Sequence, residues 1–506
     1  MAIKRYKANA DTTIVNAFQP GLVTRGTGAN MGEADVSEVF SIYGRQSTTS
    51  QELSRMLTKF PISTISTDRT AGRIAASGSV SFYLRLFNAE HSKTVPRDYA
   101  LVVQPISQSW QEGVGLDLEN YKDLTKGNTG ANWMSASSTT GWTTVGGDYL
   151  TASAVTFKQT FATGLEDLEI DITSLVEQWI DGTYTNYGVG VRLSSSYEAH
   201  FSSSTGQNSG SLINNVSGAT KSYYTKRFFA RGSQFFFKRP VIEARWNSTV
   251  KDDRGDFYYS SSLAPAADNL NVIYLYNYVR GRLTNIPGVG TGTILISLYS
   301  GSSDNSAPSG SKLTLYNGNT NITGGHLSTG IYTASMAITA AATPITTLYD
   351  VWHSGTTQYF TGSITPTVLQ GAQTVAVPTY YMNITNLKRK YRNNEISRFN
   401  LYVRNKNWDP TIYTVANATP ESTTIRSASY RVFRAVDGLE AVPYGTGSEL
   451  STQMSYDVSG NYFDFDMNLL DPGYMYAFKF AFYDSALSSW VEQPDVFKFR
   501  VESYEY

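Results

Sequence analysis

Residues 171–193, DITSLVEQWIDGTYTNYGVGVRL, predict a short amphipathic helix followed by a half-buried strand. Apolar side chains recur at i, i+3, i+4 and i+7, the spacing of one helix face; they belong to Ile172, Leu175, Val176 and Trp179. Ser174 and Glu177 have the spacing of a capping box, and Gly182 suits the left-handed residue that ends a helix. The helix is therefore expected over 174–181. Because two helical turns are marginal alone, the tryptophan must pack into a β-domain around it.

The rest of the chain reads as strands, so an all-β fold is expected. Apolar and polar side chains alternate over residues 80–86, 271–279 and 497–502, which is the pattern of strands with one buried face. Residues 470–476, LDPGYMY, have the spacing of the tyrosine corner of fibronectin-like and immunoglobulin-like sandwiches.

At 506 residues, the chain is long enough for several domains. The expected bounds are 1–247 for a first β-sandwich, 248–270 for a linker, and 271–379 and 380–506 for two smaller immunoglobulin-like β-sandwiches. The linker is inferred from its aspartates, its serine run and Pro265. It contains Arg254-Gly255-Asp256, an integrin-type tripeptide that we interpret as a chance occurrence.

Composition and charge argue against several partners. The net charge is −1 and no basic cluster is present, so no nucleic-acid partner is expected. The chain has no cysteine, which excludes disulfides and thiolate chemistry. It has no apolar run of about 18 residues and its first residues lack the apolar region of a signal peptide, so no membrane segment is expected. We therefore expect a protein made and folded in a cytoplasm.

No catalytic, cofactor-binding or metal-binding residue is assigned. The four histidines are far apart in the sequence and lack zinc spacing; they are His91, His200, His326 and His353. Asp117, Glu119 and Asp123 could offer oxygen ligands to Ca²⁺, but a solvated loop is the preferred interpretation because calcium usually needs more ligands. No nucleophile elbow, P-loop or dinucleotide fingerprint is present. A non-enzymatic protein without cofactors is expected.

Five aromatic residues are candidates for surface recognition. Trp133 and Trp142 lie in polar stretches, where they serve either recognition or buried packing. Tyr274, Tyr276 and Tyr278 share one face of an expected strand. Tyrosine is common both at protein interfaces and on ordinary strand faces, so both interpretations stay open.

Six short motifs in the first half of the chain occur in the order typical of DNRLRE-type domains. They are Asp11-Thr12, 55–62, 109–113 (SWQEG), 171–179, 188–193 and 239–246. Residues 1–247 therefore resemble that family, and the resemblance implies a jelly-roll β-sandwich related to carbohydrate-binding modules. The sequence departs from the pattern in long insertions near 115–150 and 200–225, so no sugar site is carried over.

A DNRLRE-like domain followed by immunoglobulin-like domains resembles virion structural proteins of tailed, notably marine, bacteriophages. The resemblance implies a non-enzymatic accessory component at the neck or collar, the tail or the capsid surface. Its partners would be other virion proteins and further copies of itself in a symmetric homo-oligomer, and it would reach the virion from the host cytoplasm. Two alternatives remain: a carbohydrate-binding adhesin or host receptor-binding protein that contacts a glycan, and a polysaccharide-degrading enzyme.

Overall fold

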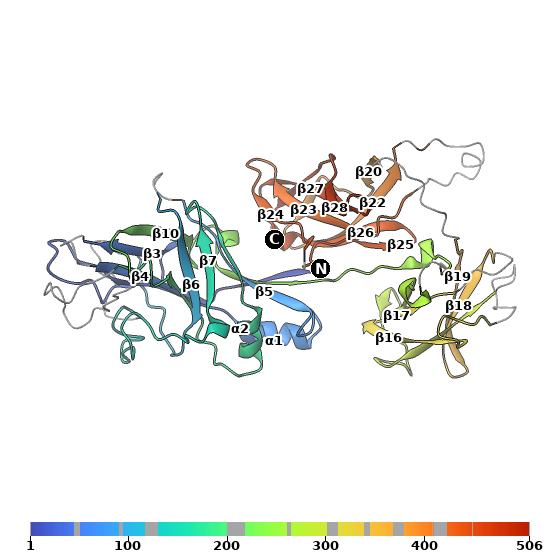
Figure 1. Ribbon diagram of the computed structural model, residues 1–506, viewed down its shortest axis with the longest axis horizontal. Helices are drawn as coiled ribbons and strands as arrows, with labels where there is room; N and C mark the ends of the chain where they lie inside the picture. Colours follow the sequence, from blue (N-terminus) through green and yellow to red (C-terminus); the bar gives the residue numbers. More distant parts are fainter. Residues whose placement is uncertain are drawn as a thin grey trace. The chain divides into compact units, whose positions relative to one another are not determined.

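A computed structural model shows an all-β chain, which confirms the expected fold class (Figure 1). The described residues are 2–44, 51–90, 95–116, 130–199, 218–260, 265–300, 312–338, 345–367, 379–406, 408, 422–447 and 449–504. They form two compact units, Ala2–Asn247 and Ser248–Tyr506.

The first unit is a sandwich of two antiparallel sheets (Figure 1). The four-stranded sheet has the order β1 (Ile3–Lys7), β11 (Val241–Trp246), β5 (Val80–Leu86) and β8 (Leu168–Asp171). The seven-stranded sheet has the order β10 (Tyr223–Phe229), β3 (Val36–Tyr43), β4 (Gln51–Lys59), β9 (Val189–Leu193), β6 (Tyr99–Pro105) and β7 (Phe157–Phe161), and β2 (Ala10–Asn16) also pairs with β4. The two rows β1-β11-β5-β8 and β4-β9-β6-β7 follow the jelly-roll order, with β2, β3 and β10 added at one side.

One apolar core lies between these sheets. Phe82 and Leu84 of β5 pack with Leu101 of β6 and Val191 of β9, and all four are fully buried. Helix α2 (Thr173–Ile180) adds its predicted apolar face to this core. Its Trp179 is 6% exposed, so the expected docking of the tryptophan is confirmed. Gly182 has φ +83°, as expected of the residue that ends the helix.

The capping-box prediction at the start of α2 was wrong. The helix begins after Ile172, whose side chain makes no capping hydrogen bond. The Glu177 carboxylate instead accepts two hydrogen bonds from Arg69, at 2.7 and 2.6 Å. A bidentate charge-assisted pair is stronger than a bond to one backbone amide, which explains why Glu177 turns away from the helix start.

Arg69 belongs to a second helix, α1 (Ile62–Thr70), that the sequence did not predict. Its residues are mostly Ser, Thr and Ile, which are weak helix formers. The helix is held by packing, because Ile65 is fully buried and Asp68 accepts a hydrogen bond from Tyr6 at 2.8 Å. The two helices lie side by side (Figure 1).

The second unit begins with one antiparallel six-stranded sheet. Its order is β12 (Asn271–Tyr276), β17 (Ile331–Met336), β16 (Ile322–Ser328), β15 (Ile294–Tyr299), β18 (Leu348–Ser354) and β19 (Thr357–Ile364), with a small hairpin of β13 (Tyr278–Val279) and β14 (Arg282–Leu283) beside it. Ile273 near one end of the sheet and Ile364 at the other belong to the same core. The two halves of the sheet therefore enclose one apolar interior.

The last part of the second unit is a sandwich of immunoglobulin type. One sheet has the order β20 (Tyr380–Ile384), β22 (Ile396–Asn405), β26 (Gly460–Asp466) and β25 (Ser455–Asp457), and the other β21 (Lys390–Arg392), β29 (Phe497–Glu502), β27 (Met475–Asp484), β23 (Ala428–Arg434) and β24 (Glu440–Val442), with β28 (Ser489–Glu492) on β27. These rows correspond to the A-B-E-D and G-F-C sheets of an immunoglobulin fold. Aromatic rings fill the interior: Phe463 lies 4.3 Å from Tyr430 and 5.1 Å from Phe478, centroid to centroid.

The predicted tyrosine corner is present at the start of β27. The Tyr476 hydroxyl donates to the Asp471 carbonyl oxygen at 3.1 Å and accepts from the Asp471 amide at 3.0 Å. Gly473 between them has φ +93°, a conformation that favours glycine. The L-x-P-G-x-x-Y spacing therefore identified both the fold type and the corner.

Residues 248–270 do not form the expected linker. Phe257 and Tyr259 are buried in the core of the six-stranded sheet, at 0% and 3% exposure. A 3-10 helix, η5 (Asp253–Asp256), lies against β12. The polar composition was misleading, because Asp253, Arg254 and Asp256 are paired within the protein.

Candidate functional site

Trp133 and Trp142 are buried, which corrects their assignment as candidate surface residues. They are 0% and 7% exposed and pack with Ile14, Leu53 and Leu57 in a second apolar core. This core lies on the face of β2 and β4 that is turned away from the sandwich interior. The polar stretch around the tryptophans is therefore a cover over that face.

Asn132 shapes this cover. Its side-chain oxygen accepts from the amides of Met134 and Ser135, at 2.9 and 2.8 Å, and its carbonyl oxygen accepts from the Trp142 indole at 2.8 Å. These bonds satisfy the backbone of a compact loop, so the tryptophan rings can turn inward. Sequence composition alone did not carry this information.

A buried ion pair lies beneath the same cover. Arg55 donates to both carboxylate oxygens of Glu198, at 3.1 and 3.0 Å, and to the carbonyl oxygen of Gly146 at 2.9 Å. Its guanidinium also lies over the Trp133 ring, 5.1 Å from the centroid. These three hydrogen bonds hold the cover on the sheet, so the arrangement is structural.

The three candidate tyrosines differ in their exposure and lie in different elements. Tyr274 and Tyr276 are half-buried on β12, with ring centroids 6.3 Å apart, whereas Tyr278 lies in the β13–β14 hairpin and is 60% exposed. Arg254 of η5 donates to the Tyr274 carbonyl oxygen at 3.4 Å. Of the three, Tyr278 is therefore the one exposed enough to form a contact surface.

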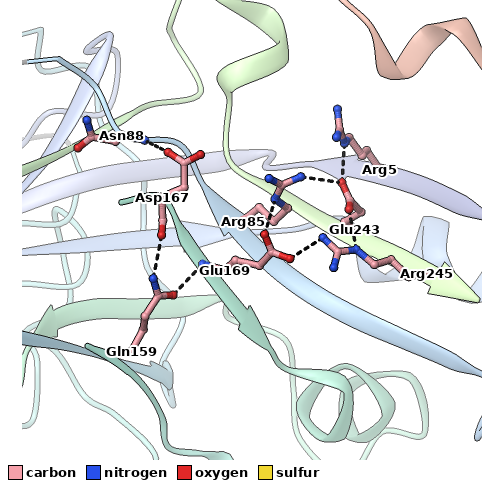
Figure 2. A network of polar contacts seen from close by, with 8 residues as sticks. All are labelled: Arg5, Arg85, Asn88, Gln159, Asp167, Glu169, Glu243 and Arg245. Atoms are coloured by element: carbon pink, nitrogen blue, oxygen red, sulfur yellow. Dashed lines mark hydrogen bonds and ion pairs between the residues drawn. The ribbon is translucent and has the colours of Figure 1, made fainter. Parts of the chain in front are cut away.

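A charged network crosses the four-stranded sheet on the face opposite the core (Figure 2). Glu243 is 1% exposed and accepts from Arg5 and Arg245 at 2.7 Å and from Arg85 at 3.4 Å. Glu169 pairs with Arg245 at 2.7 Å and with Arg85 at 3.3 Å. Burial would raise the pKa of Glu243, but the three guanidinium groups hold it well below its ordinary value. The network ties all four strands together.

Two of the sequence motifs, Asp11-Thr12 and 109–113, are in contact through Glu112. Its carboxylate accepts from the Asp11 amide at 2.9 Å and from Arg231 at 2.8 and 3.0 Å, and the Arg231 amide donates to Asp11 at 2.6 Å. The nearby glycines are tightly packed, since a Cβ at Gly32 would collide with the Glu112 carbonyl oxygen. This pair of carboxylates anchors the start of the unit through Arg231.

Asp11 makes the stability of the first unit depend on pH. Its side chain is fully buried, and burial raises its pKa to about 7. The folded state then holds a proton that the unfolded state has already lost, so stability falls between about pH 4 and 7. Calorimetry of the full chain should show this decline, and Asp11→Asn should reduce it. Asp171→Asn, at an exposed carboxylate of the same unit, is the control; an equal decline in the Asp11 variant would contradict the assignment.

The described residues contain no group of three or more acidic or histidine side chains placed to hold a metal. His353 contacts Ser297 at 3.0 Å, and His326 contacts Asn285 at 3.3 Å. His91 and His200, like Asp117, Glu119 and Asp123, lie outside the described residues. Within the described parts, no helix has the length and apolar character needed to cross a membrane.

Comparison with known proteins identifies no family for this chain. No family model matches the chain, and no curated protein matches it. Tandem Ig repeats of Dlar cover 41% of this chain and 82% of their own at 10% identity, with a TM-score of 0.12. The Ig1-2 module of the Drosophila receptor phosphatase DLAR covers 46% and 90% at 11% identity, with a TM-score of 0.13. A DUF4785 family protein of Legionella pneumophila covers 98% and 91% at 9% identity, with a TM-score of 0.14. These TM-scores are too low to relate the chain to any of the three proteins.

A junction at residues 250–259 joins the two parts of the second unit. Tyr456 of β25 donates its hydroxyl to Asp253 at 2.9 Å, while the other Asp253 oxygen accepts from the Val272 amide of β12 at 2.7 Å. Arg254 forms a bidentate pair with Asp350 of β18, with both distances 2.6 Å. The tripeptide 254–256 is therefore committed to internal contacts.

A hollow opens beside this junction. Its volume is about 400 Å³, and it is lined by Tyr258, Tyr259, Asp268, Asn269, Leu270, Asn271 and Arg426. Arg426 reaches it from the immunoglobulin-type sandwich, 170 positions from its partner Asp256. This site has no local sequence signal, because its residues come from positions as distant as Tyr258 and Arg426.

Proposed function

We propose that the chain is a non-enzymatic structural protein of a tailed-bacteriophage virion, an accessory component of the neck or collar, tail or capsid surface that acts through protein–protein contacts. The junction at 250–259 supports the structural part of this proposal. Asp253 is bonded to Tyr456 on one side and to Val272 on the other, so the two parts of the second unit share one ordered segment. Such a shared segment limits the movement of the two parts, which suits a subunit that holds a position among others.

The use of charged groups supports the same proposal. Glu243, Glu198 and Asp350 are all buried and each is paired with arginine. A buried pair of this kind stabilises a particular arrangement of strands, since removal of one partner leaves an uncompensated charge. The virion assignment itself rests on the resemblance of the domain order to phage structural proteins.

Exposed aromatic and methionine side chains near both ends of β27 are candidates for protein contacts. Tyr474, Met475 and Tyr483 on or beside β27 are 42%, 47% and 43% exposed. Aromatic residues and methionine are enriched at protein interfaces. The near-zero net charge of −1 also leaves little repulsion between copies.

The proposed role predicts a symmetric oligomer that is present in phage particles. Sedimentation of the purified protein should show several copies together, and mass spectrometry of purified particles should detect the chain. The contacts should bury more than about 1,000 Å² each. A protein that stays monomeric at high concentration and is absent from particles would contradict the role.

The non-enzymatic assignment predicts no turnover of polysaccharides, esters or peptides by the purified chain. Carboxylates such as Glu112 are engaged in ion pairs, here with Arg231, and are not placed as a free acid and base. Product formation should stay at the level of a boiled sample. Cleavage that disappears in Asp117→Ala or Glu119→Ala would instead identify an enzyme.

A further inference from the structure

We infer that the hollow beside Tyr258 and Arg426 binds a neutral mono- or disaccharide. This inference does not depend on the virion role. The hollow has a volume of about 400 Å³, within the range of small-molecule sites. Its lining combines two tyrosines, a leucine, two asparagines, one aspartate and one arginine. Among these, Tyr258 and Leu270 offer apolar surface, and Asp268 and Arg426 offer hydrogen-bonding groups for the hydroxyls of a sugar.

The apolar part of the lining comes from Tyr258 and Leu270, both half-buried. The Tyr258 backbone is held by Asn271, whose amide group donates to its carbonyl oxygen at 2.8 Å and accepts from its N–H at 3.0 Å. The ring therefore starts from a fixed backbone position. Preorganised aromatic surface loses little entropy on binding, and the C–H face of a pyranose can stack on the part of the ring beside the Arg426 guanidinium, which lies 5.5 Å from the ring centroid.

Arg426 and Asp268 supply hydrogen-bonding groups of opposite kind. The Arg426 side chain is 50% exposed, and its contacts with Asp256, at 3.2 Å, and Asp253, at 3.8 Å, both use Nη2. Among the described residues, its Nε and Nη1 donors remain for a ligand. Asp268 is exposed and can only accept when ionised. A sugar hydroxyl both donates and accepts, so neighbouring hydroxyls match this pair.

The charges around the hollow favour a neutral sugar over an acidic one. Five carboxylates and three cations lie in the junction and on the hollow: Asp252, Asp253, Asp256, Asp268 and Asp350 against Lys251, Arg254 and Arg426. A uronic acid or a phosphate would add another negative charge to a surplus of carboxylates, at a Coulomb cost. The guanidinium of Arg426 is also partly neutralised by the two aspartates that it contacts.

The test is titration of the full chain with maltose, cellobiose and lactose, followed by saturation-transfer NMR and calorimetry. At least one of the three should bind, and Asp268→Ala and Arg426→Lys should each weaken it about tenfold or more, because each removes hydrogen bonds to a charged group. Arg398→Lys is the matched control. Arg398 is 54% exposed, lies over the Tyr462 ring and pairs with Asp464 at 2.8 Å, but it does not line the hollow.

Asp268 is exposed, so its variant should fold normally even if Arg426→Lys disturbs the junction. The inference would be overturned by no binding of any of the three disaccharides, by binding that both variants leave unchanged, or by tighter binding of glucuronic acid than of the neutral sugars. Loss of binding in Arg398→Lys as well would also place the sugar elsewhere.

Discussion

Trp179→Ala is expected to lower the free energy of unfolding of the first unit by about 3–5 kcal/mol, the usual cost of removing a large buried aromatic. Trp179 is 6% exposed and is the largest side chain on the buried face of α2. Its removal would leave a cavity between the helix and the sandwich. Because a helix of eight residues has little stability alone, α2 should also lose much of its protection against amide hydrogen exchange.

Urea unfolding of the full chain, followed by circular dichroism, would measure the change in stability. Leu165→Ala is the matched control, since Leu165 lies in the same unit and is 56% exposed. Its effect should stay within about 0.5 kcal/mol, as is usual at surface positions. A Trp179 variant that unfolds at the same urea concentration as the parent would show that the helix is not held by this side chain.

Asp350→Ala is expected to destabilise the second unit by about 3–5 kcal/mol, because it leaves the Arg254 guanidinium without its carboxylate in a largely buried place. Asp350 is fully buried, and it also accepts from the Trp352 indole at 2.8 Å. A Cβ at Gly362 would collide with both members of the pair, so the site is tightly packed. The replacement should loosen β18 and the junction together.

Asp464→Ala provides the matched control for this prediction. Asp464 also forms a bidentate pair with an arginine, at 2.8 and 3.0 Å, but the Arg398 side chain of that pair is 54% exposed. Exposed pairs of this kind contribute at most about 1 kcal/mol. Equal losses of stability in the two variants would mean that the burial of Asp350 does not matter.

Local sequence patterns predicted the elements whose cause is local. The apolar face of α2 follows from 3.6-residue spacing, and the tyrosine corner at Tyr476 follows from L-x-P-G-x-x-Y. The capping box failed because Glu177 had a stronger partner, Arg69, 108 positions away. Helix α1 was missed for a similar reason, since its residues have weak helix propensity and it depends on contacts with distant parts of the chain.

The candidate site was harder to predict than the fold. Trp133 and Trp142 are buried because a polar loop covers the outer face of β4, and composition does not reveal which face a loop covers. The stretch 248–270 has the composition of a linker, but Asp253 and Arg254 find partners at positions 456 and 350. A hollow that depends on pairs of residues so far apart in the chain leaves no motif in the sequence. The alternation in Phe257-Tyr258-Tyr259, with the outer two buried, was the one available signal of strand-like packing.

The pairing of β1 with β11 brings the first and last strands of unit 2–247 together, with the Trp246 amide donating to the Ala2 carbonyl oxygen at 2.9 Å. The polypeptide thus enters and leaves this unit at a single point on its surface. Such a closed path makes the unit portable: it could be grafted into a surface loop of an unrelated protein, or circularly permuted by joining positions 2 and 247 with a short bridge, without breaking a β-pair.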